Sequence, residues 1–139
     1  MNIEVGNVLH LYFNLIHPPN YKYCIVVQTE PLIRCVLINS DLTEFAKSKP
    51  EIADEFAPIS PDECGPLFKS SWIGCGDIFG IDAAEALQTL KDCPDFHYGS
   101  ISADVAQRIV NTINSAQSLS AVKKSRSTEQ LISKYGLST

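Results

Sequence analysis

The stretch YKYCIVVQTEPLIRCVLINS, residues 21–40, decides the fold, because it contains two runs of apolar and β-branched residues around a turn. Tyr21–Gln28 and Ile33–Ser40 each predict a strand. The connection between them has the length of a hairpin loop, and its Pro31 can continue neither strand. Upstream, Gly6–Phe13 has the same composition and predicts one more strand. Consecutive strands with connections this short form an antiparallel meander.

The chain after residue 40 predicts further short strands. Asp41–Ile52 is polar and contains Pro50, so we expect a surface loop with at most a helical turn. Phe56–Ile59 predicts a short strand whose proline suits a sheet edge. Phe68–Ile81 alternates apolar residues with glycines that mark bends in curved strands, namely Gly74, Gly76 and Gly80. Five or six short strands at this spacing predict a small antiparallel barrel, in a fold that is mainly β with C-terminal helices.

Two helices are predicted after these strands. Asp82 has the position of an N-cap before Ala83–Lys91, a segment that ends ahead of a proline. Ser102 has the same position before Ala103–Gln117. In this second segment apolar residues recur at helical spacing and form one wide stripe, which needs a sheet or a partner to cover it.

The last 22 residues differ in composition from the rest of the chain. Ser118–Ser125 is rich in serine and reads as a linker, after which Ser127 and Gln130 could cap a short helix that ends at Gly136. We therefore expect a barrel domain with packed helices over residues 1–117. Residues 118–139 are expected to form a linker and a short basic helix.

Composition places the chain among ordinary globular domains and limits its partners. The 139 residues suit one domain, and 45% hydrophobic residues exclude general disorder. No apolar run approaches the roughly 20 residues of a membrane helix, and the first residues lack the basic start of a secretory signal, so we expect a cytoplasmic protein without a membrane partner. The net charge of −5 repels nucleic acid at long range, so any nucleic-acid function needs a local basic site.

The cysteines are expected to be free thiols in the core. Their number is five, an odd count, and they are scattered without a C-x-x-C pair. A zinc site built from Cys64, Cys75, Cys93 and His97 is disfavoured, because the spacings are not those of zinc ligands. We therefore predict neither a disulfide, nor a metal, nor another cofactor.

The residues that could carry chemistry lie near the start of the predicted hairpin. His17 sits in a loop beside Pro18-Pro19, just before Lys22, so its imidazole could stand near a cation. For both residues the alternative is an ordinary solvated side chain. The same holds for the tail cations Lys123, Lys124 and Arg126, which lack the interleaved aromatic residues that stack on bases.

The order of these segments resembles the PemK/MazF-like toxins. Gly6-Asn7-Val8 is similar to the family's G-D-V, and Lys22–Val27 stands where the family has R-P-x-L-V-I. Ser71–Asp82 looks like the family segment D-S-x-V-x-x-x-Q-x-R-T-I-D, and Gly99–Ser115 occupies the place of its final helix. The resemblance covers about residues 5–119, and it implies an SH3-like barrel.

The resemblance also implies an activity, a site and partners. Active members of the family cut single-stranded RNA without a metal, through the 2′-hydroxyl group. They place an arginine at the start of the second strand and a hydroxyl residue at the end of the third, where this chain has Lys22 and Ser40. His17 falls in the loop where some members carry a contributing histidine. The implied catalytic residues are thus Lys22, Ser40 and His17, and the implied partners are single-stranded RNA, an antitoxin-like protein and a second copy of the chain.

Two functions from different classes follow from the sequence. The first is a toxin-type endoribonuclease of low or no activity, because a lysine lacks the planar fork with which arginine grips two phosphate oxygens. The second is a non-catalytic SH3-like module that binds a protein partner along an open sheet edge or groove.

Overall fold

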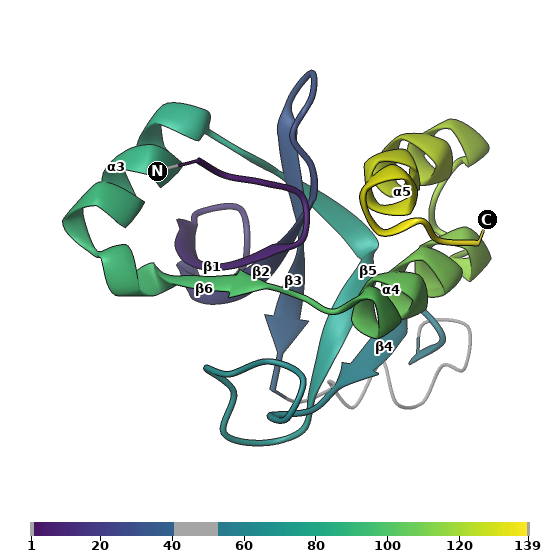
Figure 1. The fold of residues 1–139 in the computed structure, drawn as a ribbon, viewed down its shortest axis with the longest axis horizontal. Coiled ribbons are helices and arrows are strands. Elements are labelled where there is room, and N and C mark those ends of the chain that lie inside the picture. The colour runs from purple at the N-terminus through teal and green to yellow at the C-terminus, as the bar shows by residue number, and fades with distance from the viewer. Residues whose placement is uncertain (1, 41–52, 139) are drawn as a thin grey trace.

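The structure is a computed structural model and describes residues 2–40 and 53–138, so the predicted loop Asp41–Ile52 lies outside the described residues. Six strands and three α-helices follow one another along the described chain (Figure 1). In chain order they are β1 (Asn7–Phe13), β2 (Asn20–Gln28), β3 (Ile33–Asn39), β4 (Phe56–Ile59), β5 (Ser71–Ile81), α3 (Ala83–Asp92), the 3₁₀ helix η1 (Pro94–Phe96), β6 (His97–Ser100), α4 (Ala103–Ser115) and α5 (Ala121–Tyr135).

The strands form a single antiparallel sheet in the order β4-β5-β3-β2-β1-β6, which curls into a half-barrel (Figure 1). The predicted meander and the mainly β fold class are confirmed. The edge strand β6 was not predicted, because HYGS carries no strand pattern of its own and is held only by its pairing with β1.

One irregularity curves the sheet at the predicted glycines. Cys35 pairs with Phe79 and Leu37 pairs with Gly74, so four residues of β5 stand opposite Val36 alone. An insertion of this kind bends a strand and increases its twist. At Gly76 a Cβ atom would lie 2.3 Å from Glu55 Oε1, so only glycine allows this carboxylate to approach the strand and accept hydrogen bonds from the Ser118 N–H and hydroxyl.

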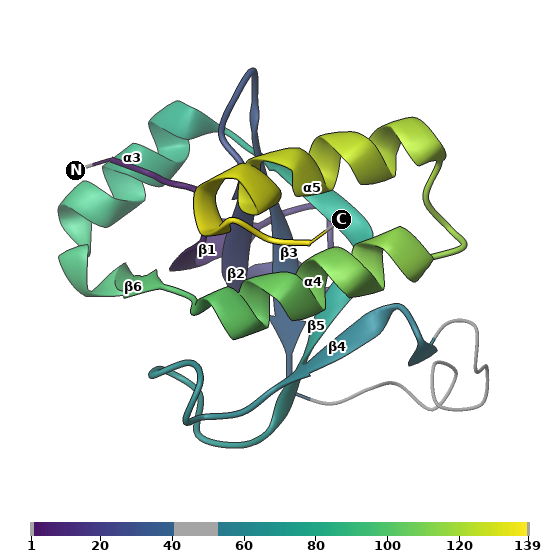
Figure 2. The same cartoon turned by 45° about the vertical axis from the view of Figure 1, so that its right-hand side comes forward.

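The two central strands are buried on both faces. Ile25, Val27, Val36 and Ile38 belong to the core beneath α4 and α5, whereas Cys24, Val26, Cys35 and Leu37 belong to the core on the side of α3. This alternation explains why the sequences CIVV and CVLI are continuously apolar. Figure 2 shows α4 and α5 side by side across one face of the sheet, with α3 at the other end of the molecule.

Helices α3 and α4 begin where their caps were predicted. The Asp82 carboxylate accepts a hydrogen bond from the Glu85 N–H at 3.0 Å, and the Ser102 hydroxyl accepts one from the Val105 N–H at 3.3 Å. The stripe of α4 is fully buried, as Ile109 illustrates with no exposed surface. No helix in the described chain is both long and apolar enough to span a membrane.

The C-terminal segment departs from the prediction of a serine linker. Helix α5 begins at Ala121 with Ser120 as its N-cap, so Ser127 and Gln130 lie inside the helix rather than at its start. The reason is tertiary packing: Ser127 and Leu131 are buried against the rest of the fold. Serine-rich segments are typical of linkers, which is why the sequence predicted one. In the folded protein the small side chains of Ser127 and Thr128 are buried on α5 and allow the helix to lie close to the sheet.

Helix α5 also fastens two other segments. The Gln130 side chain accepts a hydrogen bond from the Thr29 N–H at 2.9 Å and donates one to the Glu30 carbonyl at 2.6 Å, which holds the β2–β3 hairpin. The Tyr135 hydroxyl donates to the Ile101 carbonyl at 2.8 Å and lies where a side chain on Gly6 would be. Gly6 has a φ of +92°, so glycine is required there both for the backbone and for this contact.

We expect Leu131→Ala to lower the free energy of unfolding by about 2–5 kcal/mol, because it leaves a cavity in the core beneath α5. Val122→Ala is the matched control, since Val122 is 60% exposed on the same helix and should change stability by less than about 0.5 kcal/mol. Urea unfolding of both variants measures the difference. Equal, small effects would mean that α5 is not packed as described.

Candidate functional site

A pocket lies among residues of β1, β2, the end of β3 and the segment before β5, and we call it the Lys22 pocket. Its cavity volume is about 190 Å³. The loop before β5 closes its other side. The lining residues are His10, Tyr21, Lys22, Tyr23, Ile38, Ser40, Leu67, Phe68, Lys69 and Ser71. Two lysines, a histidine, three other aromatic side chains and two serines therefore border one cavity.

Lys22 and Ser40, two of the three predicted site residues, both border this pocket. The hydrogen-bond partner of the Lys22 ammonium is Asn39, whose Oδ1 lies 3.2 Å from Nζ. The β2–β3 register pairs Cys24 with Leu37, so continued pairing sets Lys22 opposite Asn39. Ser40 is exposed and follows the last residue of β3. Sequence reasoning expected Lys22 and Ser40 at one end of the hairpin, where the structure has both, and missed Asn39, which only the register identifies.

His17 does not line the Lys22 pocket. It is exposed in the loop between β1 and β2, beyond the last pair of that hairpin, Phe13 with Asn20. The histidine that lines the pocket is His10, which pairs with Tyr23. On β1 it lies three residues from Phe13, so it is about 10 Å from the end of the hairpin at the usual rise per residue. In sequence His10 reads as an ordinary strand histidine, and only the packing of rings around it marks the position.

Aromatic rings continue from the pocket across three adjacent strands and the 3₁₀ helix, and we call this row the aromatic stripe. Centroid distances of 4.5 Å for His10–Tyr23, 4.9 Å for His10–Phe96 and 5.3 Å for Tyr12–Tyr21 join neighbouring rings. Tyr12 and Tyr21 are about half exposed, at 56% and 48%. The members are His10, Tyr12, Tyr21, Tyr23, Phe96 and Tyr98. A partly exposed row of this kind offers flat apolar faces to a planar ligand.

Burial among these rings controls the protonation of His10. Desolvation lowers the pKa of His10 below its ordinary value of 6.5. At neutral pH the imidazole is therefore uncharged, and one ring nitrogen is available to accept a proton. The positive charge of the pocket comes from its lysines.

An ion pair holds the loop that closes the pocket. The Arg108 guanidinium of α4 donates to both Glu63 carboxylate oxygens, at 2.9 and 2.8 Å, and to the Pro58 carbonyl at 2.8 Å. These bonds lower the pKa of Glu63 to about 2, against the opposing effect of burial. The loop that carries Phe68 and Lys69 is thus tied to α4.

The cysteines lie mostly in the core, as predicted. Cys24, Cys35, Cys64 and Cys75 are buried, and burial raises the pKa of Cys64 to about 11 and that of Cys75 to about 12. Buried thiols of this kind stay protonated and are poor nucleophiles. Within residues 2–40 and 53–138 no group of three or more His, Cys, Asp or Glu side chains could hold a metal ion.

Comparison with known proteins gives no family assignment. No protein-family model matches the sequence, and no curated protein matches it either. The assignment of a function therefore depends on the chemistry of the Lys22 pocket and of the surfaces around it.

We expect Glu63→Gln to lower the free energy of unfolding by about 1 kcal/mol at neutral pH, because a charged and bidentate acceptor is lost. A carboxyl group whose pKa is lower in the folded protein stabilises the fold above its unfolded pKa. For Glu63 this stabilisation should be lost as pH falls from about 4.5 towards about 2. Urea unfolding should therefore show wild type and variant converging as the solution is acidified. Glu129→Gln, at an exposed position on α5, is the control and should not reproduce the trend.

Proposed function

We propose that this protein binds single-stranded RNA at the Lys22 pocket and along the aromatic stripe. The observation that carries the proposal is that Lys22 and Lys69 line one pocket with His10, Tyr21 and Tyr23, from which the ring contacts of the aromatic stripe continue. Aromatic side chains stack on unpaired bases, and lysines neutralise the phosphates between them. Because the whole chain carries a net charge of −5, a local site of this kind is what RNA binding requires here.

Single strands fit this surface better than a duplex. Stacking on Tyr21 or Tyr12 needs a base whose face is free, and bases in a helix are already stacked on each other. The exposed Phe68, at 89%, stands at the mouth of the pocket and offers another apolar face. RNA bound in this way would have its phosphates near Lys22 and its bases on the stripe.

The proposal includes slow cleavage of the bound RNA through the 2′-hydroxyl group, in keeping with the resemblance to PemK/MazF-like toxins. Neutral His10 accepts the proton of the 2′-hydroxyl, the oxygen attacks the adjacent phosphorus, and the 5′-oxygen leaves with a proton from water, which yields a 2′,3′-cyclic phosphate. In this mechanism the Lys22 ammonium turns from Asn39 towards the pocket and stabilises the charge that develops on the phosphorane, and the Ser40 hydroxyl lies beside it. A lysine is a point charge without the fork of arginine, so the rate is low.

The same resemblance brings a homodimer, an antitoxin-like partner and a cytoplasmic location into the proposal. The alternative function, a protein-interaction module without catalysis, gains support from a second pocket on the other side of the sheet, which is treated in the next subsection.

We expect Lys22→Ala to weaken binding of a single-stranded RNA and to reduce the slope of log K against log salt concentration by about 0.7, the value for one phosphate contact on a single strand. Lys22→Arg should preserve the slope. Substitution of Lys123, Lys124 or Arg126 by alanine is the control, because these side chains lie on α5 and should change binding less. Fluorescence anisotropy at several salt concentrations measures the slopes. If the α5 variants lose binding and Lys22→Ala keeps it, the site is wrong.

We expect His10→Gln to abolish cleavage because glutamine cannot accept the proton, while RNA binding is reduced but retained because the exposed rings of Tyr12 and Tyr21 remain. In wild type the rate should be constant at neutral pH and fall on the acid side of pH 6.5, since protonation of His10 removes the base. Separation of end-labelled RNA on a gel measures both. His17→Gln is the matched control and should cleave like wild type. If His17→Gln loses activity and His10→Gln keeps it, His17 rather than His10 is the general base.

A further inference from the structure

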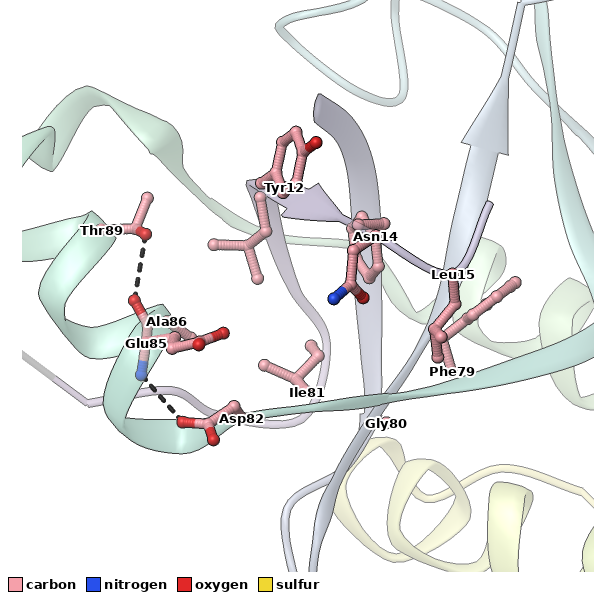
Figure 3. Close-up of a pocket in the computed structure, with 12 residues that line it drawn as sticks. Tyr12, Asn14, Leu15, Phe79, Gly80, Ile81, Asp82, Glu85, Ala86 and Thr89 are labelled. Carbon is pink, nitrogen blue, oxygen red and sulfur yellow. Dashed lines mark hydrogen bonds between the residues drawn. The ribbon is translucent and has the colours of Figure 1, made fainter. Parts of the chain in front are cut away.

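A second pocket, which we call the acidic pocket, lies between α3 and the neighbouring ends of β1 and β5 (Figure 3). Its floor is apolar: Leu11, Phe13 and Ala86 are buried, and Ile81 is partly buried beside them. The cavity volume is about 330 Å³. The acidic pocket shares no lining residue with the Lys22 pocket.

The charge of the acidic pocket is entirely negative. Asp82 and Glu85 line it, and none of its lining residues is Lys, Arg or His. Asp82 uses one carboxylate oxygen to cap α3, by accepting the Glu85 N–H at 3.0 Å. Figure 3 shows the Glu85 carboxylate directed from α3 towards the space bounded by Ile81 and Asn14. A ligand that suits this arrangement has a cationic end and an apolar body.

The rim of the pocket favours a polypeptide over a small amine. Leu15 is 75% exposed and Tyr12 is 56% exposed, and both line the pocket. A small cation in contact with Glu85 and the floor would leave this apolar rim in water. A peptide that places one side chain in the pocket can cover Leu15 with a neighbouring residue.

We propose that the acidic pocket binds an arginine side chain of a partner protein, together with an apolar residue next to it. The guanidinium group can engage the Glu85 carboxylate with two parallel hydrogen bonds, and it is weakly hydrated, so it enters a partly apolar pocket more readily than an ammonium group does. The apolar neighbour packs on Leu15. The acidic pocket shares no lining residue with the Lys22 pocket, and its charged residues Asp82 and Glu85 lie outside the aromatic stripe, so the guanidinium site does not depend on RNA binding.

The test uses the full chain labelled with ¹⁵N and the peptide acetyl-Gly-Leu-Arg-Leu-Gly-amide. Titration should shift the backbone amides of Asn14, Gly80 and Thr89, which line the pocket. The same peptide with Glu in place of Arg should leave them unshifted. Butylguanidinium is the control for a small cationic ligand. It should bind more weakly than the peptide, because it cannot cover Leu15.

Variants separate the charge from the apolar contact. Asp82→Asn keeps a good N-cap residue and removes one charge, and its combination with Glu85→Gln should weaken peptide binding by about fivefold. Leu15→Ala should weaken the peptide and leave butylguanidinium unchanged. Glu129→Gln, which removes a charge elsewhere, should bind normally. The proposal is overturned if the Glu peptide binds equally well, if no amide of the pocket shifts, or if butylguanidinium matches the peptide.

Discussion

The burial of two adjacent strands on both faces is the constraint on which the rest of the structure depends. Side chains alternate between two cores along β2 and β3, and each buried valine, isoleucine or leucine contributes about 1.5–3 kcal/mol only if something covers it. Helices must therefore lie on both sides of the sheet. α4 and α5 pack on one face, whereas α3 contributes only Ala86 and Leu90 to the core of the other, and the acidic pocket opens beside it.

The surface that we propose for RNA binding lies where this two-sided burial stops. Along β2 the apolar run begins at Cys24, and the residues before it, Tyr21–Tyr23, are exposed or only partly buried. The end of β3 lies beside them, so Lys22 meets Asn39 at the same edge of the core. These side chains are only partly covered, by rings such as Phe96 of η1, so some of their polar groups and ring faces stay accessible. The β2–β3 register that pairs the buried core residues therefore also places Lys22 beside the end of β3.

Charge is separated between the two pockets. The Lys22 pocket combines lysines with rings, and the acidic pocket combines Asp82 and Glu85 with an apolar floor. At physiological ionic strength, fields from charges on opposite parts of a small protein are screened within about 8 Å. Each pocket can therefore attract a ligand of its own sign although the chain as a whole is acidic. Two such surfaces are compatible with one protein that holds RNA at one place and a partner at another.

The sequence by itself determined the features that arise from neighbouring residues. These are the hairpin around Pro31, the caps Asp82 and Ser102, the glycine bends of β5 and the burial of most cysteines, because alternation, capping and turn chemistry act over a few positions. Tertiary structure alone decided the rest. Strand β6 exists through its pairing with β1, and α5 begins at Ala121 because its hydroxyl-rich face is buried. Strand register places Asn39 beside Lys22, and it places His10 rather than His17 in the pocket. Register pairs residues that are far apart in the chain, so the sequence around each residue does not reveal it.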